Sequence, residues 1–408
     1  MIDFKIIRDN PDLVKSSIER RGLDLDLDQL LAIDQAWRRL KPELDSLRSI
    51  KPQSKPTEQE LAKMQETKVK RKKLEQDLAV LEARRLELWQ EVPNLIAEGT
   101  PDGGEENNQV IKQYSTKLEV GASQGLPDLA SWMEDQGLVD FERGAKVAGA
   151  KFYYQDARML KLWRAISSLA IEVLEKAGFS LIVVPNMVKQ AVAEGTGFMP
   201  KGEEDQNYLI ADQGLVMIAT AEIPLTGYHM DETINLSQPK LYAAISPCYR
   251  LEAGAYGKYS KGMYRVHQFE KLEMYAYCEP DQAEDLHSKI LEVEQEIAQL
   301  LEIPYRIVLN ATRDLGAPAY KKYDIEYFDP DSGEYRELTS CSNCTDYQAR
   351  KLNIRFADQG KLEFAYTLNG TAVTSSRTIL AILANHRDQA GKVRLPSALV
   401  KYYGKEEL

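Results

Sequence analysis

The stretch CYRLEAGAYGKYSKGMYRVHQFEKLEM, residues 248–274, decides the fold class because it predicts two strands joined by a glycine-rich loop. We expect the strands to cover residues 245–253 and 263–278, with Gly254, Gly257 and Gly262 in the loop. Successive strand residues point to opposite faces, which puts Val266, Leu272 and Met274 on a core side. The other face gathers one aromatic ring and several charged or polar groups: Arg250, Glu252, Arg265, His267, Phe269, Lys271 and Glu273.

This polar wall suits a nucleotide. Arginine binds phosphate in a bidentate manner, an aromatic ring stacks on a base, and a carboxylate accepts a hydrogen bond from an exocyclic amine. The alternative is a ladder of cross-strand salt bridges on a solvent-exposed face. The pattern alone leaves both interpretations open.

A second constellation lies in LEFAYTLNGTAVTSSRTILAILANH, residues 362–386. We expect a strand that ends at Leu368, a turn at Asn369-Gly370, and a helix that begins near Ser375. Arg377 then lies in the first turn of the helix, where the helix dipole disfavours a cation unless an anion is held there. A bound phosphate would remove that conflict, and a solvent-facing arginine is the alternative.

The surrounding chain favours an α+β fold. Short runs rich in β-branched or aromatic residues, KFYYQ (151–155) and FSLIVVP (179–185), alternate with helical stretches at 157–177 and 281–301. Because the order lacks a regular βαβ rhythm, we expect a mainly antiparallel sheet flanked by helices. The chain contains no G-x-G-x-x-G and no G-x-x-x-x-G-K-[ST], which excludes the Rossmann and P-loop modes of nucleotide binding.

The N-terminal part predicts an antiparallel coiled-coil hairpin. Leucines and other apolar residues repeat at heptad spacing over residues 29–50 and again over 74–95. KPQSKP (51–56) interrupts the helices, and TEQE (57–60) predicts a capping box that opens the second one. Pro42 should kink the first helix or mark its end. The linker-like PDGGEENNQV (101–110) places the domain boundary between an arm of residues 1–105 and an α+β domain of residues 106–408.

Charge is distributed unevenly along the 408 residues. The formal net charge of −11 excludes a chain-wide nucleic-acid-binding surface, so such a surface must be local. Between residues 38 and 73, twelve Lys and Arg residues face five Asp and Glu residues, a local net charge of +7. This segment predicts a surface that follows nucleic-acid phosphates, although a solvated helical face is the alternative. The candidate residues are Arg38, Arg39, Lys68, Lys70, Arg71, Lys72 and Lys73.

Four cysteines are too few for a disulfide framework and suit a reducing, cytoplasmic setting. The pair in CSNC (341–344) has metal-knuckle spacing, but no second pair or histidine lies near it in the sequence, so we expect no zinc. The absence of any run of 18 apolar residues predicts no membrane-spanning helix.

Taken in order, these segments resemble the bacterial seryl-tRNA synthetases, which are class II aminoacyl-tRNA synthetases. MIDFKIIRDNPDLVKSSIERRG (1–22) looks like that family's N-terminus, and the helical hairpin resembles its tRNA-binding arm. GFSLIVVPNMV (178–188) is similar to motif 1, which builds the dimer interface in the family. TAEIPL (220–225) matches the serine-binding segment, and residues 249–274 match motif 2. ELTSCSNCTDYQAR (337–350), a segment that binds no metal through cysteine in the family, precedes TLNGTAVTSSRT (367–378), which matches motif 3.

The resemblance implies a role for each matching residue. The implied serine-binding residues are Thr220, Ala221, Glu222, Glu273, Asn369 and Thr371, of which Thr220 and Glu222 hold the ammonium group while Glu273 and Thr371 receive the hydroxyl. The implied ATP-binding residues are Arg250, Leu251, Glu252, Arg265, Phe269, Glu337, Leu338, Thr339, Ser340 and Arg377. Among these, Arg250 binds the α-phosphate, Glu252 the adenine amine, Phe269 the base and Arg377 the distal phosphates. Glu337 and Ser340 would coordinate Mg²⁺, and the implied catalytic residues are Arg250, Arg377 and Glu337.

The resemblance further implies that a homodimer uses ATP and L-serine and binds tRNA(Ser) through its long variable arm and acceptor end. It leaves open whether tRNA(Sec) is charged as well. The alternative is a catalytically silent synthetase paralogue that acts as an RNA- or protein-binding module. Such a protein would be expected to lose Arg250, Glu273, Glu337 or Arg377, and all four are present. One departure from the family pattern is Ala384, which stands where motif 3 usually has a glutamate.

Overall fold

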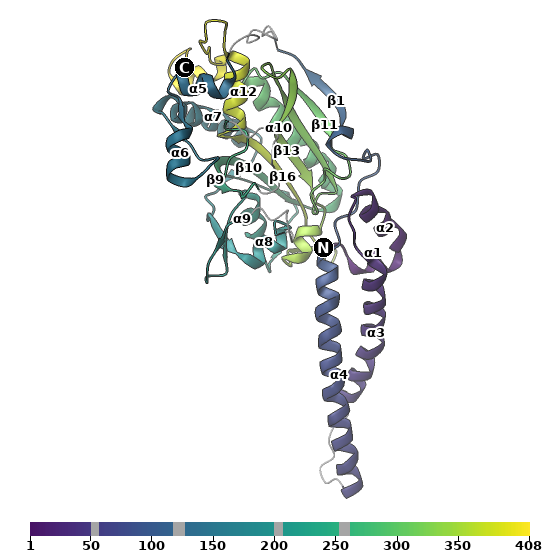
Figure 1. Ribbon diagram of the computed structural model, residues 1–408. Helices are drawn as coiled ribbons and strands as arrows, with labels where there is room; N and C mark the ends of the chain where they lie inside the picture. Colours follow the sequence, from purple (N-terminus) through teal and green to yellow (C-terminus); the bar gives the residue numbers. More distant parts are fainter. Residues whose placement is uncertain (50–56, 117–126, 200–206, 253–261) are drawn as a thin grey trace. The chain divides into compact units, whose positions relative to one another are not determined.

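The structure is a computed structural model that describes residues 1–49, 57–116, 127–199, 207–252 and 262–408. It divides into two compact units, Met1–Leu95 and Ile96–Leu408 (Figure 1). The predicted interruption at 51–56 and the predicted loop glycines Gly254 and Gly257 lie outside the described residues. The division of function between residues 1–105 and 106–408 stays a prediction.

The first unit contains the predicted hairpin. Its helices are α1 (Phe4–Asp9), α2 (Pro11–Arg20), α3 (Leu27–Ser49) and α4 (Glu58–Glu91). Figure 1 shows α3 and α4 side by side, and Arg48 of α3 bonds Glu75 of α4 at 3.0 Å. The capping box is confirmed, because Thr57 and Glu60 exchange side-chain-to-backbone hydrogen bonds at the start of α4. The heptad seam is confirmed by a cluster in which Leu44, Leu74 and Leu78 are buried.

Of the two alternatives predicted for Pro42, a kink or the end of the first helix, the structure excludes the end, because α3 continues through Pro42 to Ser49. A proline inside a helix removes one hydrogen bond and crowds the carbonyl four residues before it, at a cost of about 3 kcal/mol. Leu40 and Leu44, on either side of Pro42, pack in the seam against α4. Tertiary packing therefore holds the helix together across a residue that would end an isolated one.

The second unit is built on one large sheet, and the predicted α+β fold is confirmed. The strand order is β1-β11-β12-β13-β16-β10-β9-β4, in which neighbours are antiparallel except for β4 and β9. The strands span, in that order, Gln109–Tyr114, Tyr305–Leu309, Lys321–Asp329, Glu334–Asn343, Tyr366–Thr374, Gln268–Cys278, Lys240–Tyr249 and Ser180–Leu181.

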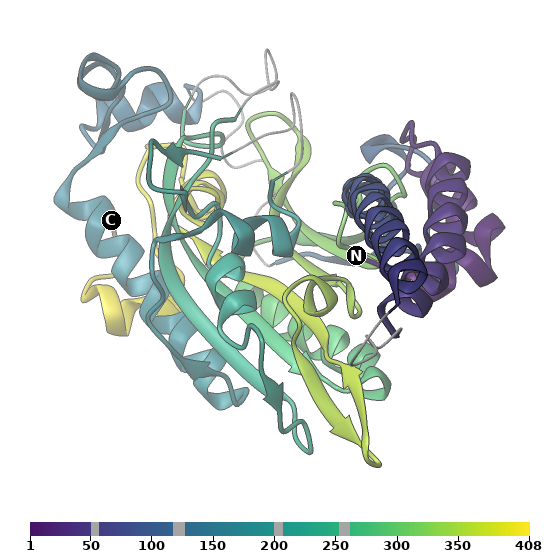
Figure 2. The ribbon, with the colours of Figure 1, turned by 90° about the horizontal axis from the view of Figure 1, so that it is seen from below.

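Three helices cover one face of this sheet: α7 (Ala157–Lys176), α10 (Ala283–Leu300) and α12 (Arg377–His386) (Figure 2). Leu272 and Met274 of β10 are buried in the core under these helices, as the alternation predicted. The residues between them along the strand, such as Glu273, therefore point to the opposite face. That opposite face carries the candidate site.

Smaller elements complete the second unit. The helices are α5 (Leu129–Asp135), α6 (Phe141–Ala148), α8 (Gln190–Thr196), α9 (Glu222–Gly227), α11 (Tyr347–Lys351) and α13 (Ser397–Tyr403). The short strands are β2 (Val139–Asp140), β3 (Tyr154–Gln155), β5 (Met187–Lys189), β6 (Leu209–Ile210), β7 (Leu215–Met217), β8 (Thr233–Ile234), β14 (Arg355–Asp358) and β15 (Lys361–Phe364). None of the helices in the described ranges combines the length and the apolar sequence that crossing a membrane requires.

The predicted turn at Asn369-Gly370 is wrong, because β16 runs straight through it from Tyr366 to Thr374. A Cβ at Gly370 would lie 2.3 Å from Cγ2 of Ile290 and 2.8 Å from Oε1 of Glu294. The glycine therefore allows α10 to pack closely on the sheet. Asn-Gly usually indicates a hairpin turn, but here Gly370 lies inside a strand, where its missing side chain leaves room for α10.

The segment expected to be a linker is attached to the sheet unit. Arg313 donates from its backbone N–H to the carbonyl of Gly103 at 2.9 Å, and Asn108 bonds Asp314 at 2.9 Å. Residues 109–114 then form the edge strand β1. This polar, glycine-rich segment is therefore an ordered part of the sheet unit.

Candidate active site

Two adjoining cavities lie on the face of the sheet opposite α7 and α10. The first is lined by Arg250, Glu252, Tyr264, Val266, Phe269, Lys271, Glu337, Leu338, Thr339, Ser340, Thr371, Thr374, Ser376 and Arg377. Residues of the second include Thr220, Glu222, Arg250, Lys271, Glu273, Lys322, Ser340, Asn369 and Thr371. Four side chains therefore belong to both cavities: Arg250, Lys271, Ser340 and Thr371. Ligands in the two cavities would therefore share contacts with these four side chains.

Two β-bulges bring key side chains onto this face. In β13, Thr339 pairs with Ile325 while Glu337 pairs with the next residue of β12, so Leu338 is the extra residue. In β16, Val373 pairs with Leu272 while Thr371 pairs with Glu273, so Ala372 is extra. A bulge shifts the alternation by one residue. Glu337 therefore shares a face with Ser340, and Thr371 shares a face with Thr374.

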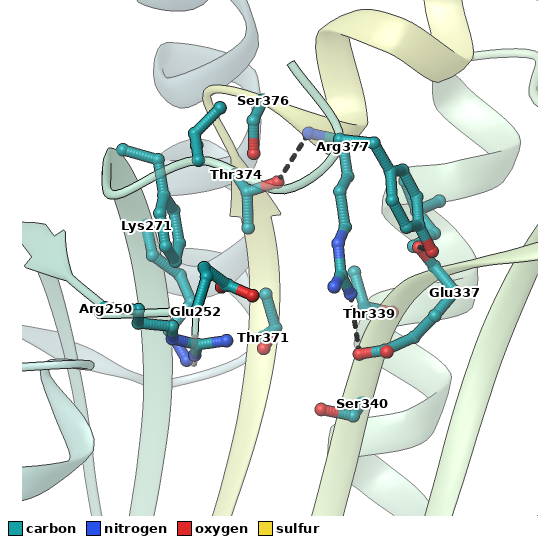
Figure 3. A pocket seen from close by; sticks show the side chains of 14 residues that line it. Arg250, Glu252, Lys271, Glu337, Thr339, Ser340, Thr371, Thr374, Ser376 and Arg377 are labelled. Carbon is teal, nitrogen blue, oxygen red and sulfur yellow. Dashed lines mark hydrogen bonds and ion pairs between the residues drawn. The ribbon is translucent and has the colours of Figure 1, made fainter. Parts of the chain in front are cut away.

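An ion pair lies on one side of the first cavity. The Arg377 guanidinium and the Glu337 carboxylate are 2.7 Å apart, and the backbone N–H of Arg377 donates to the Thr374 hydroxyl at 3.1 Å (Figure 3). Burial alone would raise the pKa of Glu337, but the positive charges of Arg377 and Lys322 lower it to about 2. Arg377 begins α12, as predicted, and its charge at that helix end is balanced here by a carboxylate.

The opposite side of the first cavity holds Arg250 and Glu252 (Figure 3). The Arg250 guanidinium lies 5.2 Å from the centre of the Phe269 ring, and its Nε donates to the Ala219 carbonyl at 3.3 Å. Glu252 accepts a bond from Arg265 at 3.3 Å. Cations thus lie on both sides of a cleft that also contains an aromatic ring, an arrangement that can bind a polyphosphate with an attached base.

The second cavity is centred on two buried carboxylates. Glu273, 1% exposed, forms an ion pair with Lys271 and accepts a hydrogen bond from the Thr220 hydroxyl at 3.2 Å. Glu222 accepts bonds from Gln348 at 2.8 Å and from Asn369 at 3.0 Å. Hydrogen bonds and the ion pair with Lys271 orient these carboxylates beside the cavity, so the cavity can bind a small molecule with an ammonium group and a hydroxyl.

Burial also sets the ionisation of these carboxylates. Burial, and then the nearby charge of Glu273, raise the pKa of Glu222 to about 7. Burial likewise raises the pKa of Glu273, while the charge of Lys271 opposes the shift. A bound ammonium group would favour the charged form of Glu222, which links amino-acid binding to the ionisation of this residue.

Most of the predicted site residues line a cavity. Those in the first cavity are Arg250, Glu252, Phe269, Glu337, Leu338, Thr339, Ser340 and Arg377, and those in the second include Thr220, Glu222, Glu273, Asn369 and Thr371. Leu251, Arg265 and Ala221 are not among the lining residues of either cavity. Ala221 is fully buried in the core, and Arg265 donates to Glu252, which lines the first cavity.

The predicted strand positions around the loop need correction. β9 ends at Tyr249 and β10 begins at Gln268, so Arg250 and Glu252 lie beyond the strand, and Glu252 has a left-handed φ of 47°. His267 does not belong to the wall, because its Nδ1 bonds the Arg250 carbonyl at 2.9 Å. Val266, predicted to face the core, lines the first cavity instead. The alternation fails here because these residues are not in a strand.

Sequence reasoning missed Tyr264 and Lys322, and it gave Lys271 no role. Lys271 lies two residues before Glu273 on the predicted polar wall, so strand alternation could have predicted the ion pair between them. Lys322 lies on β12 with its Nζ 3.2 Å from Asp324. The pairing of β12 with β13 brings Lys322 near the site, and no local pattern in the chain predicts that pairing.

In the first unit, the predicted tRNA-binding side chains are all exposed: Arg38, Arg39, Lys68, Lys70, Arg71, Lys72 and Lys73. Lys70 pairs with Glu43 at 2.7 Å, and Arg71 lies 3.9 Å from Glu75. Surface pairs of this kind contribute little to stability, so the positive charge stays accessible to a partner.

Comparisons with known proteins agree with this geometry. Residues 1–96 match the family described as "Seryl-tRNA synthetase N-terminal domain", and residues 208–386 match "tRNA synthetase class II core domain (G, H, P, S and T)". The chain is 42% identical to the serine–tRNA ligase of Dictyoglomus thermophilum, covering 100% of this chain and 99% of that protein. It is 39% identical to the serine–tRNA ligase of Borrelia recurrentis, covering 99% and 98%. The crystal structure of seryl-tRNA synthetase from Pyrococcus horikoshii complexed with ATP is similar, with a TM-score of 0.91, 37% identity, and coverage of 100% and 99%.

Proposed function

The chain belongs to the seryl-tRNA synthetase family of class II aminoacyl-tRNA synthetases, and we propose that it activates L-serine with ATP and transfers the serine to tRNA(Ser). The single observation that carries this proposal is the junction of the two cavities at Arg250, Lys271, Ser340 and Thr371. Activation joins a carboxylate to an α-phosphate, so the two substrates must meet at a shared boundary. The cations of that boundary lie where the two anionic groups approach each other.

ATP occupies the first cavity in this proposal. Phe269 stacks on the adenine, and Glu252 accepts a hydrogen bond from its amine. Arg250 binds the α-phosphate, and Arg377 binds the distal phosphates from the other side of the cleft. Phosphoryl chemistry of this kind depends mainly on alignment and on neutralisation of charge, which two opposed arginines supply.

Serine occupies the second cavity. Glu222 and Thr220 hold its ammonium group, and Glu273 accepts the hydrogen of its hydroxyl beside Thr371. The substrate carboxylate is already ionised at neutral pH, so its attack on the α-phosphorus requires no general base. The reaction forms the bond from a carboxylate oxygen to the α-phosphorus and breaks the bond to the pyrophosphate oxygen. A ribose hydroxyl at the 3′ end of the tRNA then displaces AMP from the adenylate.

Mg²⁺ fits the donors of the first cavity. Glu337 and Ser340 share one face of β13, and both offer oxygen ligands. Among the described residues, no group of three or more His, Cys, Asp or Glu side chains is arranged to hold a metal. Two protein oxygens suit Mg²⁺, which binds through one or two protein groups together with substrate phosphates. When bound there, Mg²⁺ would neutralise phosphate charge, while Glu337 stays ionised because its pKa is about 2.

We assign tRNA binding to the helical arm and the chemistry to the sheet unit. The basic residues of α3 and α4 carry few aromatic neighbours, which favours recognition of backbone and shape over base reading. A homodimer is supported by exposed apolar residues around motif 1, where Val183 is 95% exposed and Met187 is 47% exposed. Such an enzyme would act in the cytoplasm, where protein synthesis uses the seryl-tRNA that it makes.

The test is amino-acid-dependent exchange of pyrophosphate with ATP, compared for serine, threonine, alanine and glycine. We expect strong exchange with serine alone, because only serine places a hydroxyl at Glu273 without the extra methyl group of threonine. Equal exchange with alanine would contradict the assigned serine pocket. Absence of exchange with every amino acid, in a protein that is folded by circular dichroism, would favour the silent paralogue.

A further inference from the structure

Tyr264 touches both members of the ion pair in the first cavity. It lies in the connection that precedes β10, whereas Glu337 belongs to β13 and Arg377 begins α12. The Tyr264 hydroxyl donates to the backbone carbonyl of Glu337 at 3.3 Å. The guanidinium carbon of Arg377 lies 4.8 Å from the centre of the Tyr264 ring. One aromatic side chain therefore connects three segments that are far apart in the sequence.

The cation of Arg377 needs such support. It stands at the first residue of a helix, where the helix dipole opposes a positive charge. An arginine side chain loses considerable rotamer freedom when it is fixed in one position. The ion pair with Glu337 restrains it at Nη1, which lies 2.7 Å from Oε1. A second restraint on the plane of the guanidinium would fix its orientation.

A ring face supplies that restraint without occupying hydrogen-bond donors. A guanidinium held over an aromatic face is attracted by the ring, and its N–H groups point outward in its own plane. Those donors stay available for phosphate oxygens. Burial raises the pKa of Tyr264 to about 12, so the phenol stays protonated at neutral pH and keeps its bond to the Glu337 carbonyl.

We infer that Tyr264 is a positioning residue that orients Arg377 toward the distal phosphates of ATP. This inference rests on the proposed function of the first cavity as an ATP site. Tyr264 acts through Arg377 and through the strand that carries Glu337. Its removal should therefore weaken the binding of ligands that reach Arg377 and spare ligands that do not.

The experiment compares the affinities of ATP and AMP by calorimetry, in the presence of Mg²⁺ and without an amino acid. The variants are Tyr264→Phe, which keeps the ring, and Tyr264→Leu, which removes it. We expect Tyr264→Leu to weaken ATP binding roughly 3- to 30-fold, the range of a cation–π contact. AMP, which lacks the distal phosphates, should bind as in the wild type. Tyr264→Phe, which keeps the ring and loses the bond to the Glu337 carbonyl, should weaken ATP binding less than Tyr264→Leu does.

A double-mutant cycle tests whether Tyr264 acts through the arginine. In an Arg377→Met background, Tyr264→Leu should have no further effect on ATP affinity, because the group that it orients is absent. Tyr335→Leu is the matched control. The Tyr335 ring lies 4.4 Å from the guanidinium of Arg306, and neither residue is among those that line the two cavities. This control removes the same kind of contact from the same sheet and should leave ATP affinity unchanged.

Two results would overturn the inference. An equal loss of ATP and AMP affinity in Tyr264→Leu would mean that the ring supports the base or the fold rather than Arg377. Additive effects of Tyr264→Leu and Arg377→Met would mean that the two residues act independently. These binding measurements need no serine, so a protein that behaves as expected here and still lacks serine-dependent exchange would contradict only the proposed function.

Discussion

The exchange of one carboxylate for an amide, Glu273→Gln, separates charge from shape in the serine pocket. Glu273 is 1% exposed, lies in an ion pair with Lys271, and accepts a bond from Thr220. Glutamine preserves the volume and one acceptor oxygen but removes the negative charge. A hydrogen bond to a charged group contributes about 1.5 to 3 kcal/mol, so serine should lose roughly 10- to 150-fold in kcat/KM.

Alanine provides the internal reference for this variant. It has no hydroxyl to place at Glu273, so its kcat/KM should stay within about threefold of the wild-type value. The assay is pyrophosphate exchange with each amino acid, combined with thermal unfolding of each variant. The serine-to-alanine ratio should fall by the same factor as the serine value.

Glu326→Gln is the matched control. Glu326 is 8% exposed and forms an ion pair with Arg306, and it is not among the residues that line either cavity. Both variants leave a cation beside a neutral amide, so a general loss of stability would affect them alike. An unchanged serine-to-alanine ratio in a folded Glu273→Gln protein would refute the assignment of Glu273.

Three further predictions concern ionisation, metal and the arm. Burial raises the pKa of Glu222 from an ordinary 4.5 to about 7, so protonated Glu222 contributes stability to the folded protein below pH 4.5, and this contribution is lost as the pH rises through 7. Glutamine stays neutral at every pH. Glu222→Gln should therefore raise the thermal midpoint above that of the wild type at pH 8 but not at pH 5. Glu337→Gln should raise the Mg²⁺ concentration for half-maximal exchange by roughly tenfold or more, with an unchanged KM for serine, and an unchanged Mg²⁺ titration would remove Glu337 from the metal site. Arg85→Met should destabilise the arm by about 1.5–3 kcal/mol in denaturant unfolding, because the buried Asp34 carboxylate loses its 2.7 Å partner and keeps Arg8 at 3.9 Å; a loss below about 1 kcal/mol would show that the pair is not structural.

The sequence predicted the elements whose patterns are long and regular. Heptad spacing gave both arm helices, and alternation along β10 correctly separated Leu272 and Met274 from Glu273. The placement of Phe269 and Glu273 on one face of β10 followed from the same alternation. These patterns succeed because they record burial on one side of a single element.

Features that depend on contacts between elements were not predictable. The bulges at Leu338 and Ala372 change which residues face the site, and nothing in their local sequence marks them. Gly370 resembled a hairpin turn because the need for close packing comes from α10, which is distant in sequence. Glu252 lies outside the predicted strand, in a left-handed backbone conformation that glutamate seldom adopts. Each error arose where tertiary packing overrode a local preference.

The most direct test of the account is the attachment of radiolabelled serine to a tRNA(Ser) transcript, compared with a transcript whose long variable arm is shortened. We expect the full transcript to accept serine efficiently and the shortened one to accept little, because the basic surface of α3 and α4 would lose its target. A protein that catalyses serine-dependent exchange and charges both transcripts equally would contradict the role of the arm. A protein that charges neither transcript would contradict the proposal that this chain is a serine–tRNA ligase.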